Sequence, residues 1–425
     1  MTSPTGVRWM REPVAGVGRR LIHINTSDRG GGVAEILDNV TRHDEFRGHP
    51  TGWMVIDASD EFFAVTKGLH HLFHGREDPS LLEDGAKEYR DVLEDVSVLI
   101  ESEIRQDDIL VLHDPQTLGL ASWAAQRGNP VYWHCHIGTL RSSVEVREAL
   151  WNFFAHDLRA VDAVLVTEPG FLQGAQISRV LVVHPAIDPD APKNVRIDAA
   201  DVAAHLETIG TNSMTGAVGT AGRVWQDAPV PDHAPVVLQV SRWDPLKGIR
   251  DVLRVVEHLD PRVHVVVAGP DPAEVLDDPE GVDQLDEALQ QLHELPAPIR
   301  SRVHLIALSA QDRDLNALHV NALQRRADVV VQRSVEEGFG LTITEAMFKG
   351  KPVVATRTGG IPRQIKDRVN GLLVEPGDDE AFIVAVNELV ADEGLRAELG
   401  AAAESSVRRG YLIDRLVRNY DMLRK

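Results

Sequence analysis

The sequence of 425 residues contains one cysteine, Cys135. A single cysteine excludes an internal disulfide and an all-cysteine metal site, and such a chain suits a reducing compartment. The chain also lacks a run of about 18 apolar residues, the length that crosses a membrane as a helix. Met1–Arg20 has no apolar segment of signal-peptide length. We therefore expect a cytoplasmic protein without a membrane partner.

Basic side chains are also scarce, because 44 lysines and arginines stand against 65 acidic residues and leave a net charge of −21. A chain of this charge repels phosphate backbones unless a local basic patch overrides the repulsion, so we expect no nucleic-acid partner. Apolar residues make up 43 % and charged residues 26 % of the chain, which excludes disorder as its main character. The length favours two domains over one.

Short apolar runs alternate with amphipathic helical stretches along the whole chain, which is typical of buried parallel strands in βαβ units. In the first half the runs are Leu21–Ile24, Trp53–Ile56, Ile109–Leu112, Val131–Trp133, Ala163–Val166 and Val180–Val183. In the second half they are Val236–Val240, Val263–Ala268, Val303–Ile306, Asp328–Val331 and Pro352–Ala355.

These two series are separated by Pro185–Pro235, which contains one helical segment near Ala199–Ile209. The pattern predicts an α/β protein with two Rossmann-like, doubly wound domains that face one another across a cleft. We place the domains at residues 1–190 and 191–408. The remaining tail, 409–425, carries a helical apolar stripe.

The most informative segment is Ser334–Gly350, with the sequence SVEEGFGLTITEAMFKG. Glu337 precedes a glycine-bounded turn, and a helix over Gly340–Lys349 would contain Glu345. A helix N-terminus attracts anions, and carboxylates bind sugar hydroxyls, so the segment could hold a charged sugar derivative. An exposed helix start stabilised by its own acidic residues is the alternative that these residues leave open.

Two loops at strand ends could contribute to the same ligand. The segment SRWDPLKG places Arg242 and Lys247 after a predicted strand, where they could neutralise a diphosphate or be surface cations on a turn. The segment SDRGGGVAE, Ser27–Glu35, lets the backbone approach a ligand closely or forms a plain turn. It is not a dinucleotide-binding GxGxxG fingerprint.

Histidines follow two further strands, in His113-Asp114-Pro115-Gln116 and His134-Cys135-His136. Side chains two apart on a strand point to the same side, so a metal site is conceivable. No further ligand has dedicated spacing, so we predict no metal. Packed structural histidines and polar contacts with a ligand both remain open. We expect Cys135 to pack inward.

Taken together, these segments resemble the retaining GT-B glycosyltransferases of the family-4 type. The resemblance covers nearly the whole chain, in the order GGGVAE, HDPQ, HCHI, SRWDPLKG and EGFGLTITE. Within that group the sequence looks most like the trehalose glycosyltransferring synthases, over NALQRRADVVVQRSVEEGFGLTITEAMFKGKPVVATRTGGIPRQI. The E-x7-E spacing from Glu337 to Glu345, combined with Arg242 and Lys247, is its most specific part.

The resemblance implies a GT-B fold in which 1–190 binds the acceptor, 191–408 binds a nucleotide sugar, and the 409–425 helix packs back on the first domain. It implies transfer of a sugar from a nucleoside-diphosphate sugar (UDP, ADP or GDP) to a small molecule, trehalose-synthase-like, with no tightly bound cofactor. The anomeric configuration would be retained without a protein nucleophile. The oligomeric state stays open, with a homodimer as one option.

The resemblance also implies roles for single residues. Arg242 and Lys247 would hold the leaving diphosphate, Glu337 the hydroxyls of the donor sugar, and Glu345 the ribose. The further implied positions are His136 at the donor sugar, the amides of Phe339, Gly340 and Leu341 at the phosphates, Gly31 and Gly32 over the diphosphate, and His113, Asp114 and Gln116 at the acceptor.

One position departs from the pattern of this family. Trehalose-forming relatives are expected to carry an aspartate where Gly138 stands, so the acceptor could differ from glucose. The alternative function is a natural-product glycosyltransferase of an antibiotic pathway that uses a GDP- or other NDP-sugar and a thiol or amine acceptor. A catalytically silent sugar-nucleotide binder and a sugar-nucleotide epimerase are the rival classes.

Overall fold

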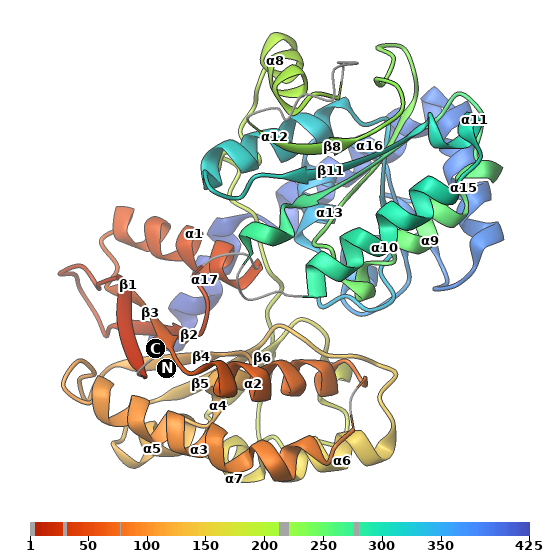
Figure 1. Cartoon of the computed structure of the whole chain (residues 1–425). Helices are drawn as coiled ribbons and strands as arrows, with labels where there is room; N and C mark the ends of the chain where they lie inside the picture. Colours follow the sequence, from red (N-terminus) through yellow and green to blue (C-terminus); the bar gives the residue numbers. More distant parts are fainter. Residues whose placement is uncertain (1–4, 29–31, 77, 212–220, 276–279) are drawn as a thin grey trace. The chain divides into compact units, whose positions relative to one another are not determined.

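The structure, a computed structural model, describes residues 5–28, 32–76, 78–211, 221–275 and 280–425. The chain divides into two compact units, Met1–Ala186 with Ile413–Lys425, and Ile187–Leu412. Each unit is built on a seven-stranded sheet (Figure 1). Among the described residues, no helix is both long and apolar enough to cross a membrane.

The sheet of the first unit has the strand order β1-β3-β2-β4-β5-β6-β7. Its strands are β1 (Gly6–Arg11), β2 (Leu21–Asn25), β3 (Thr51–Asp57), β4 (Ile109–His113), β5 (Val131–Cys135), β6 (Ala163–Val166) and β7 (Val180–Val182). The six strands from β2 to β7 coincide with the predicted apolar runs and pair in parallel. The edge strand β1 was not predicted; it runs antiparallel to β3, and none of its side chains is fully buried.

Helices cover both faces of this sheet (Figure 1). On one face, α1 (Gly32–Phe46) packs against the C-terminal helix α17 (Ile413–Asp421). The remaining helical segments are α2 (Asp60–Phe73), α3 (Leu81–Ile100), α4 (Asp114–Leu118), α5 (Ala121–Gln126), α6 (Val144–Phe153), α7 (Ala155–Leu158) and the 3-10 turns η1 (Pro169–Leu172) and η5 (Met422–Arg424). As predicted, the C-terminal helix belongs to the first unit, where Arg424 pairs with Asp44 of α1 at 3.6 Å.

Alternation along β2 decides which side chains face α17. Ile22 and Ile24 belong to the large apolar core of this unit. His23 lies between them and therefore faces the opposite side of the sheet. There its ring lies 4.8 Å from the ring of Tyr420, which α17 supplies.

The sheet of the second unit has the order β14-β13-β12-β9-β10-β11-β8, with only β8 antiparallel to its neighbour. Its strands are β8 (Gly222–Trp225), β9 (Val236–Val240), β10 (His264–Pro270), β11 (Val303–Leu308), β12 (Val329–Gln332), β13 (Val353–Thr356) and β14 (Leu372–Val374). The five strands from β9 to β13 were predicted, and the two short edge strands were missed. Separate apolar cores fill the two faces of the sheet.

The helical segments of the second unit include both helices predicted within it, α8 (Ala199–Ile209) and α13 (Leu341–Phe348). The others are η2 (Pro245–Lys247), α9 (Ile249–Arg254), η3 (Val256–His258), η4 (Pro272–Glu274), α10 (Glu280–Glu294), α11 (Ala297–Arg300), α12 (Arg313–Arg326), α14 (Ile361–Gln364), α15 (Asp379–Ala391) and α16 (Glu393–Gly410).

Candidate active site

The second unit brings Lys247 and Glu337 into a direct ion pair. Lys247 ends η2 after β9, and Glu337 lies in the loop between β12 and α13. The lysine Nζ lies 2.9 Å from Glu337 Oε1 and 2.8 Å from Oε2, and the Ser334 hydroxyl donates to Oε2 at 2.9 Å. The side chains are 17 % and 10 % exposed, so the pair is partly shielded from water.

A residue that sequence reasoning missed joins the two loops of this pair. Gln239 is fully buried on β9. Its Nε2 donates to the Lys247 carbonyl at 2.9 Å, and its Oε1 accepts from the Arg333 amide at 3.1 Å. The signal in the sequence was a glutamine inside the otherwise apolar run VVLQV, because a buried amide needs hydrogen-bond partners.

The remaining predicted cation, Arg242, lies on the same turn as Lys247. Its guanidinium donates to Asp244 Oδ2 at 3.0 Å, and Asp244 Oδ1 accepts from the Leu246 amide at 2.7 Å. Gly248 closes the turn at a φ of +64°, and a Cβ there would lie 2.1 Å from the Arg333 carbonyl oxygen. The turn that carries both cations therefore requires glycine at this position.

Helix α13 begins beside the ion pair. Gly340 is its N-cap at a φ of +87°, and Leu341 is its first residue. Phe339 is buried in the core, where its ring lies 5.7 Å from that of Tyr411. Gln364 holds the turn, because its Nε2 donates to the carbonyls of Phe339 and Gly340. The hydrogen bonds from Gln364 thus fix the backbone at the N-terminus of α13, the end that we predicted to bind an anion.

The side chain of Glu345 is fully buried. Its Oε1 lies 3.5 Å from Lys193 Nζ, and its Oε2 accepts from Gln324 at 3.4 Å. Its contact with a ribose stays a prediction.

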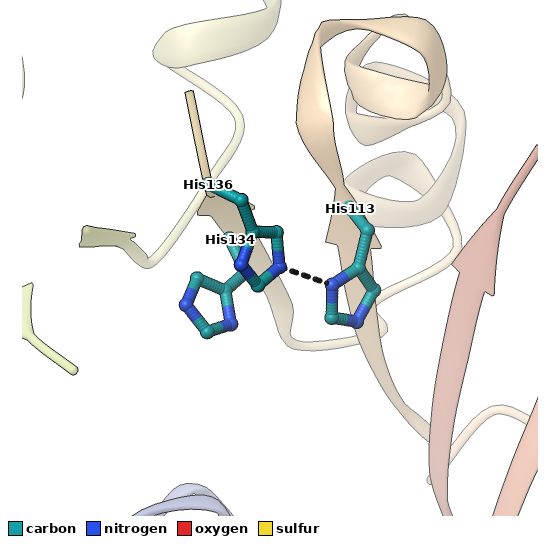
Figure 2. Close-up of side chains that lie close together, drawn as sticks. All are labelled: His113, His134 and His136. Atoms are coloured by element: carbon teal, nitrogen blue, oxygen red, sulfur yellow. Dashed lines mark hydrogen bonds between the residues drawn. The ribbon is translucent and has the colours of Figure 1, made fainter. Parts of the chain in front are cut away.

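In the first unit, His113, His134 and His136 gather at the carboxyl ends of β4 and β5 (Figure 2). His113 pairs with His134 in the strand register. His113 Nδ1 lies 2.9 Å from His136 Nε2, and the rings of His134 and His136 stack with centroids 3.9 Å apart. Their exposed fractions are 1 %, 1 % and 8 %, so all three imidazoles are buried.

Two residues that were not predicted complete this cluster. His23 Nδ1 lies 2.9 Å from His113 Nε2, and the Tyr420 hydroxyl lies 2.7 Å from His134 Nδ1. A histidine inside the buried run LIHIN was the available signal for His23. Tyr420 lies nearly 300 residues from His134 in sequence, so only the fold brings the two together.

Burial keeps these imidazoles neutral. Desolvation lowers the pKa of His23 and of His136 to about 3, and it lowers those of His113 and His134 well below the ordinary range. Neutral rings act as hydrogen-bond donors and acceptors and do not serve as cations. Cys135 packs inward as expected, and burial raises the pKa of its thiol.

The three histidines also have the chemistry of a metal site, since one nitrogen from each lies within 4.8 Å of the others. The 2.9 Å contact between His113 Nδ1 and His136 Nε2 is a hydrogen bond, which places a proton on one of these nitrogens. A metal would need lone pairs on its ligand atoms. The prediction of no metal therefore stands as a prediction for this cluster.

Asp114 supports the histidine cluster through the backbone. Its Oδ1 accepts from the His136 amide at 2.7 Å, and its φ is +59°. Desolvation raises the pKa of its carboxyl group to about 7. Gln116, also predicted at the acceptor, has a buried Oε1 without a hydrogen-bond partner among the described residues. Of the predicted glycines, Gly32 begins α1 and is exposed, whereas Gly31 lies outside the described residues.

Comparison with known proteins matches both units to glycosyltransferase families. Residues 23–173 match the family described as trehalose synthase, N-terminal domain, and residues 225–406 match glycosyl transferases group 1. The trehalose synthase of Pyrococcus horikoshii is 31 % identical over 95 % of this chain and 89 % of its own length. That of Rubrobacter xylanophilus is 31 % identical over the same shares. This chain belongs to the trehalose synthase family.

As a member of the trehalose synthase family, the chain is a glycosyltransferase. Solved structures agree on the GT-B fold: trehalose-6-phosphate synthase OtsA has a TM-score of 0.72 at 14 % identity, covering 96 % of this chain and 99 % of that one. The HepE protein of Anabaena, in complex with UDP and glucose, has a TM-score of 0.65 at 19 % identity, with 95 % and 98 % covered. These relatives lend no support to an antibiotic pathway.

The structure gives a steric reason for glycine at position 138, where we expected an aspartate in the trehalose synthase family. A Cβ on Gly138 would lie 2.5 to 2.9 Å from three side-chain atoms of Phe171. The ring of Phe171 thus occupies the space that an aspartate side chain would need.

Proposed function

We propose that this glycosyltransferase forms trehalose by moving a glucosyl group from a nucleoside-diphosphate glucose to glucose, with retention of configuration. The kinship with trehalose synthases along 95 % of the chain carries the proposal. The likeness to a protein solved with UDP-glucose supports a nucleotide sugar as donor. In this proposal residues 191–408 bind the donor and residues 1–190 bind the acceptor.

The transfer breaks the bond between sugar C1 and the diphosphate oxygen. The sugar then becomes oxocarbenium-like while negative charge grows on the leaving phosphate. Arg242, Lys247 and the amides at the start of α13 would stabilise that charge, which is largest in the transition state. The acceptor hydroxyl attacks C1 from the same face and passes its proton to the phosphate oxygen, so no protein nucleophile is needed.

Lys247 and Glu337 would act together in this step. An ammonium group has three donors, and contacts to both Glu337 oxygens occupy two of them. The third is left for a phosphate oxygen. Glu337 in turn would accept from hydroxyls of the donor sugar while it fixes the position of the lysine Nζ.

The experiment is a transfer assay with UDP-, ADP- or GDP-glucose and glucose, with α,α-trehalose identified by NMR. We expect the disaccharide with at least one donor, and its loss in Lys247→Met and Glu337→Gln. Arg250→Met is the matched control, because Arg250 forms an exposed ion pair with Glu287 at 3.1 Å in the same unit. Absence of trehalose with every donor would refute the proposal.

A second candidate is transfer to a small acceptor other than glucose, such as a thiol or an amine. The ring of Phe171 beside Gly138 favours it, because the expected acceptor-binding aspartate has no space there. The same assay distinguishes the candidates when thiol and amine acceptors replace glucose. The nucleotide released without acceptor measures plain hydrolysis of the donor.

A further inference from the structure

A second buried glutamine of the second unit is linked to the ion pair of Lys247 and Glu337. Gln332 is the last residue of β12 and is 2 % exposed. Its Nε2 donates to the hydroxyl oxygen of Ser334 at 2.8 Å, and the fully buried Ser334 hydroxyl donates in turn to Glu337 Oε2 at 2.9 Å. The proposed function uses Glu337 to bind hydroxyls of the donor sugar and gives Gln332 and Ser334 no role.

We propose that Gln332 and Ser334 are positioning residues that fix the Glu337 carboxylate through two successive hydrogen bonds and leave its Oε1 to accept from a hydroxyl of the donor sugar. This inference rests on the donor-binding part of the proposed function. Neither Gln332 nor Ser334 would touch the substrate.

The direction of both hydrogen bonds follows from the chemistry of the side chains. A carboxylate paired with an ammonium group only accepts, and the Ser334 hydroxyl has a single proton, so this proton goes to Glu337 Oε2. The Ser334 oxygen can then only accept from Gln332, so the amide must turn its Nε2 toward it. The Gln332 Oε1 faces the Thr342 hydroxyl, which donates to it at 3.3 Å. The two bonds therefore run in one direction, from the Gln332 amide to the Glu337 carboxylate.

The contacts of Glu337 are divided unequally between its two oxygens. Oε2 accepts from both Ser334 and Lys247, which occupies its two lone pairs. Among the described residues, Lys247 is the hydrogen-bond partner of Oε1, so this oxygen keeps a lone pair for a sugar hydroxyl. The terminal torsion of a glutamate side chain is soft. The Ser334 bond is therefore needed, besides the lysine, to hold the plane of the carboxylate.

The two buried glutamines act on the ion pair from opposite faces of the sheet. On β9, Gln239 follows Leu238, which belongs to one apolar core, so Gln239 faces the other core. On β12, Gln332 follows Val331, which belongs to the second core, so Gln332 faces the first. Gln239 joins the backbones of the two loops, whereas Gln332 acts on the side chain of Glu337. A substitution of Gln332 therefore removes none of the bonds that join the loops.

The test measures the binding of a nucleotide-glucose and of its free nucleoside diphosphate by calorimetry, with UDP, ADP and GDP as the nucleotides. The two ligands differ by the sugar, so the ratio of their Kd values reports the contacts of the sugar. The variants are Gln332→Met, which removes the amide, Ser334→Ala, which removes the hydroxyl, and the double variant. Gln226→Met is the matched control, because Gln226 bonds through both amide atoms, to His304 at 2.8 Å and to the Gly210 carbonyl at 3.0 Å. His304 lies near the amino end of β11, at the opposite edge of the sheet from the ion pair.

We expect Gln332→Met and Ser334→Ala each to raise the Kd of the nucleotide-glucose by about 10-fold, the size of effect that follows the loss of a hydrogen bond to a charged group. The Kd of the free nucleotide should stay nearly unchanged, because Lys247 remains in place. The double variant should bind no more weakly than the single variants, since both changes break the same series of bonds, whereas independent contributions would multiply to about 100-fold. Gln226→Met should leave both constants unchanged.

An unchanged ratio in Gln332→Met, equal weakening of both ligands, or a multiplied loss in the double variant would overturn the inference. If Gln332→Met does not fold, Thr342→Val takes its place, because it removes the hydroxyl that donates to Gln332 at nearly constant side-chain size. Binding with the expected ratios but without trehalose in the transfer assay would refute the proposed function and leave this inference standing. Failure of every nucleotide-glucose to bind would overturn both.

Discussion

The pair formed by Lys247 and Glu337 allows a prediction that separates stability from catalysis. Of the contacts described above for the Glu337 carboxylate, Lys247→Met removes those to the lysine Nζ and leaves the hydrogen bond from the Ser334 hydroxyl. Removing one partner of a buried pair costs about 3–5 kcal/mol. Because the two side chains here are 17 % and 10 % exposed, we expect Lys247→Met to lower the free energy of unfolding by about 2 kcal/mol. For a unit of this size that lowers Tm by roughly 4–8 °C.

The assay is a double-mutant cycle of Lys247→Met and Glu337→Gln, measured by thermal unfolding and by transferase turnover. The single changes should not be additive, with a coupling energy of about 1–2 kcal/mol. Turnover should fall by about 10²-fold or more in each single variant, because a group that stabilises transition-state charge is lost. The exposed pair of Arg250 and Glu287 should show coupling below about 0.5 kcal/mol. Zero coupling between Lys247 and Glu337 would refute the reasoning.

Three further outcomes are expected. Gly248→Ala should lower the free energy of unfolding by more than about 2 kcal/mol, which chemical denaturation measures. The φ of +64° disfavours a side chain, and a Cβ at this position would clash with the Arg333 carbonyl oxygen. Asp114 has a folded pKa of about 7 against 3.8 ordinarily, so the folded state binds its proton more tightly and stability should fall as pH rises from about 4 to about 7. Asp114→Asn should flatten that part of the stability–pH curve. Gly138→Asp should lower Tm, and adding Phe171→Ala should recover it; no recovery would contradict the steric explanation.

The central strands were predictable because their burial leaves an uninterrupted apolar run in the sequence. Leu21–Asn25 and Val236–Val240 are fully buried in the structure. The edge strands β1 and β8 were not, because their side chains are only partly buried and each forms by antiparallel pairing with another strand. The edge strand β14 is buried, but its three residues are too short a run to stand out in the sequence. Gly222–Trp225 becomes a strand by antiparallel pairing with β11, a partner far along the chain.

Short motifs in the sequence identified the candidate residues, whereas contacts that depend on the fold were not predicted. Arg242, Lys247 and Glu337 were found from local spacing, and the structure joins Lys247 to Glu337. The enclosure of Glu345 was not found, because the helical pattern of α13 does not tell which side Lys193 and Gln324 cover.

His23 and Gln239, which sequence reasoning missed, occupy equivalent places in the sheets of the two units. They are polar residues inside the first parallel strand of their sheet, and both are fully buried. A polar group buried without partners costs free energy, so each must be hydrogen-bonded to a polar group near the end of a neighbouring strand or in a loop. His23 bonds to His113, and Gln239 bonds to the loops of Lys247 and Glu337. A polar residue inside a buried strand run therefore indicates where the sheet holds its functional loops in place.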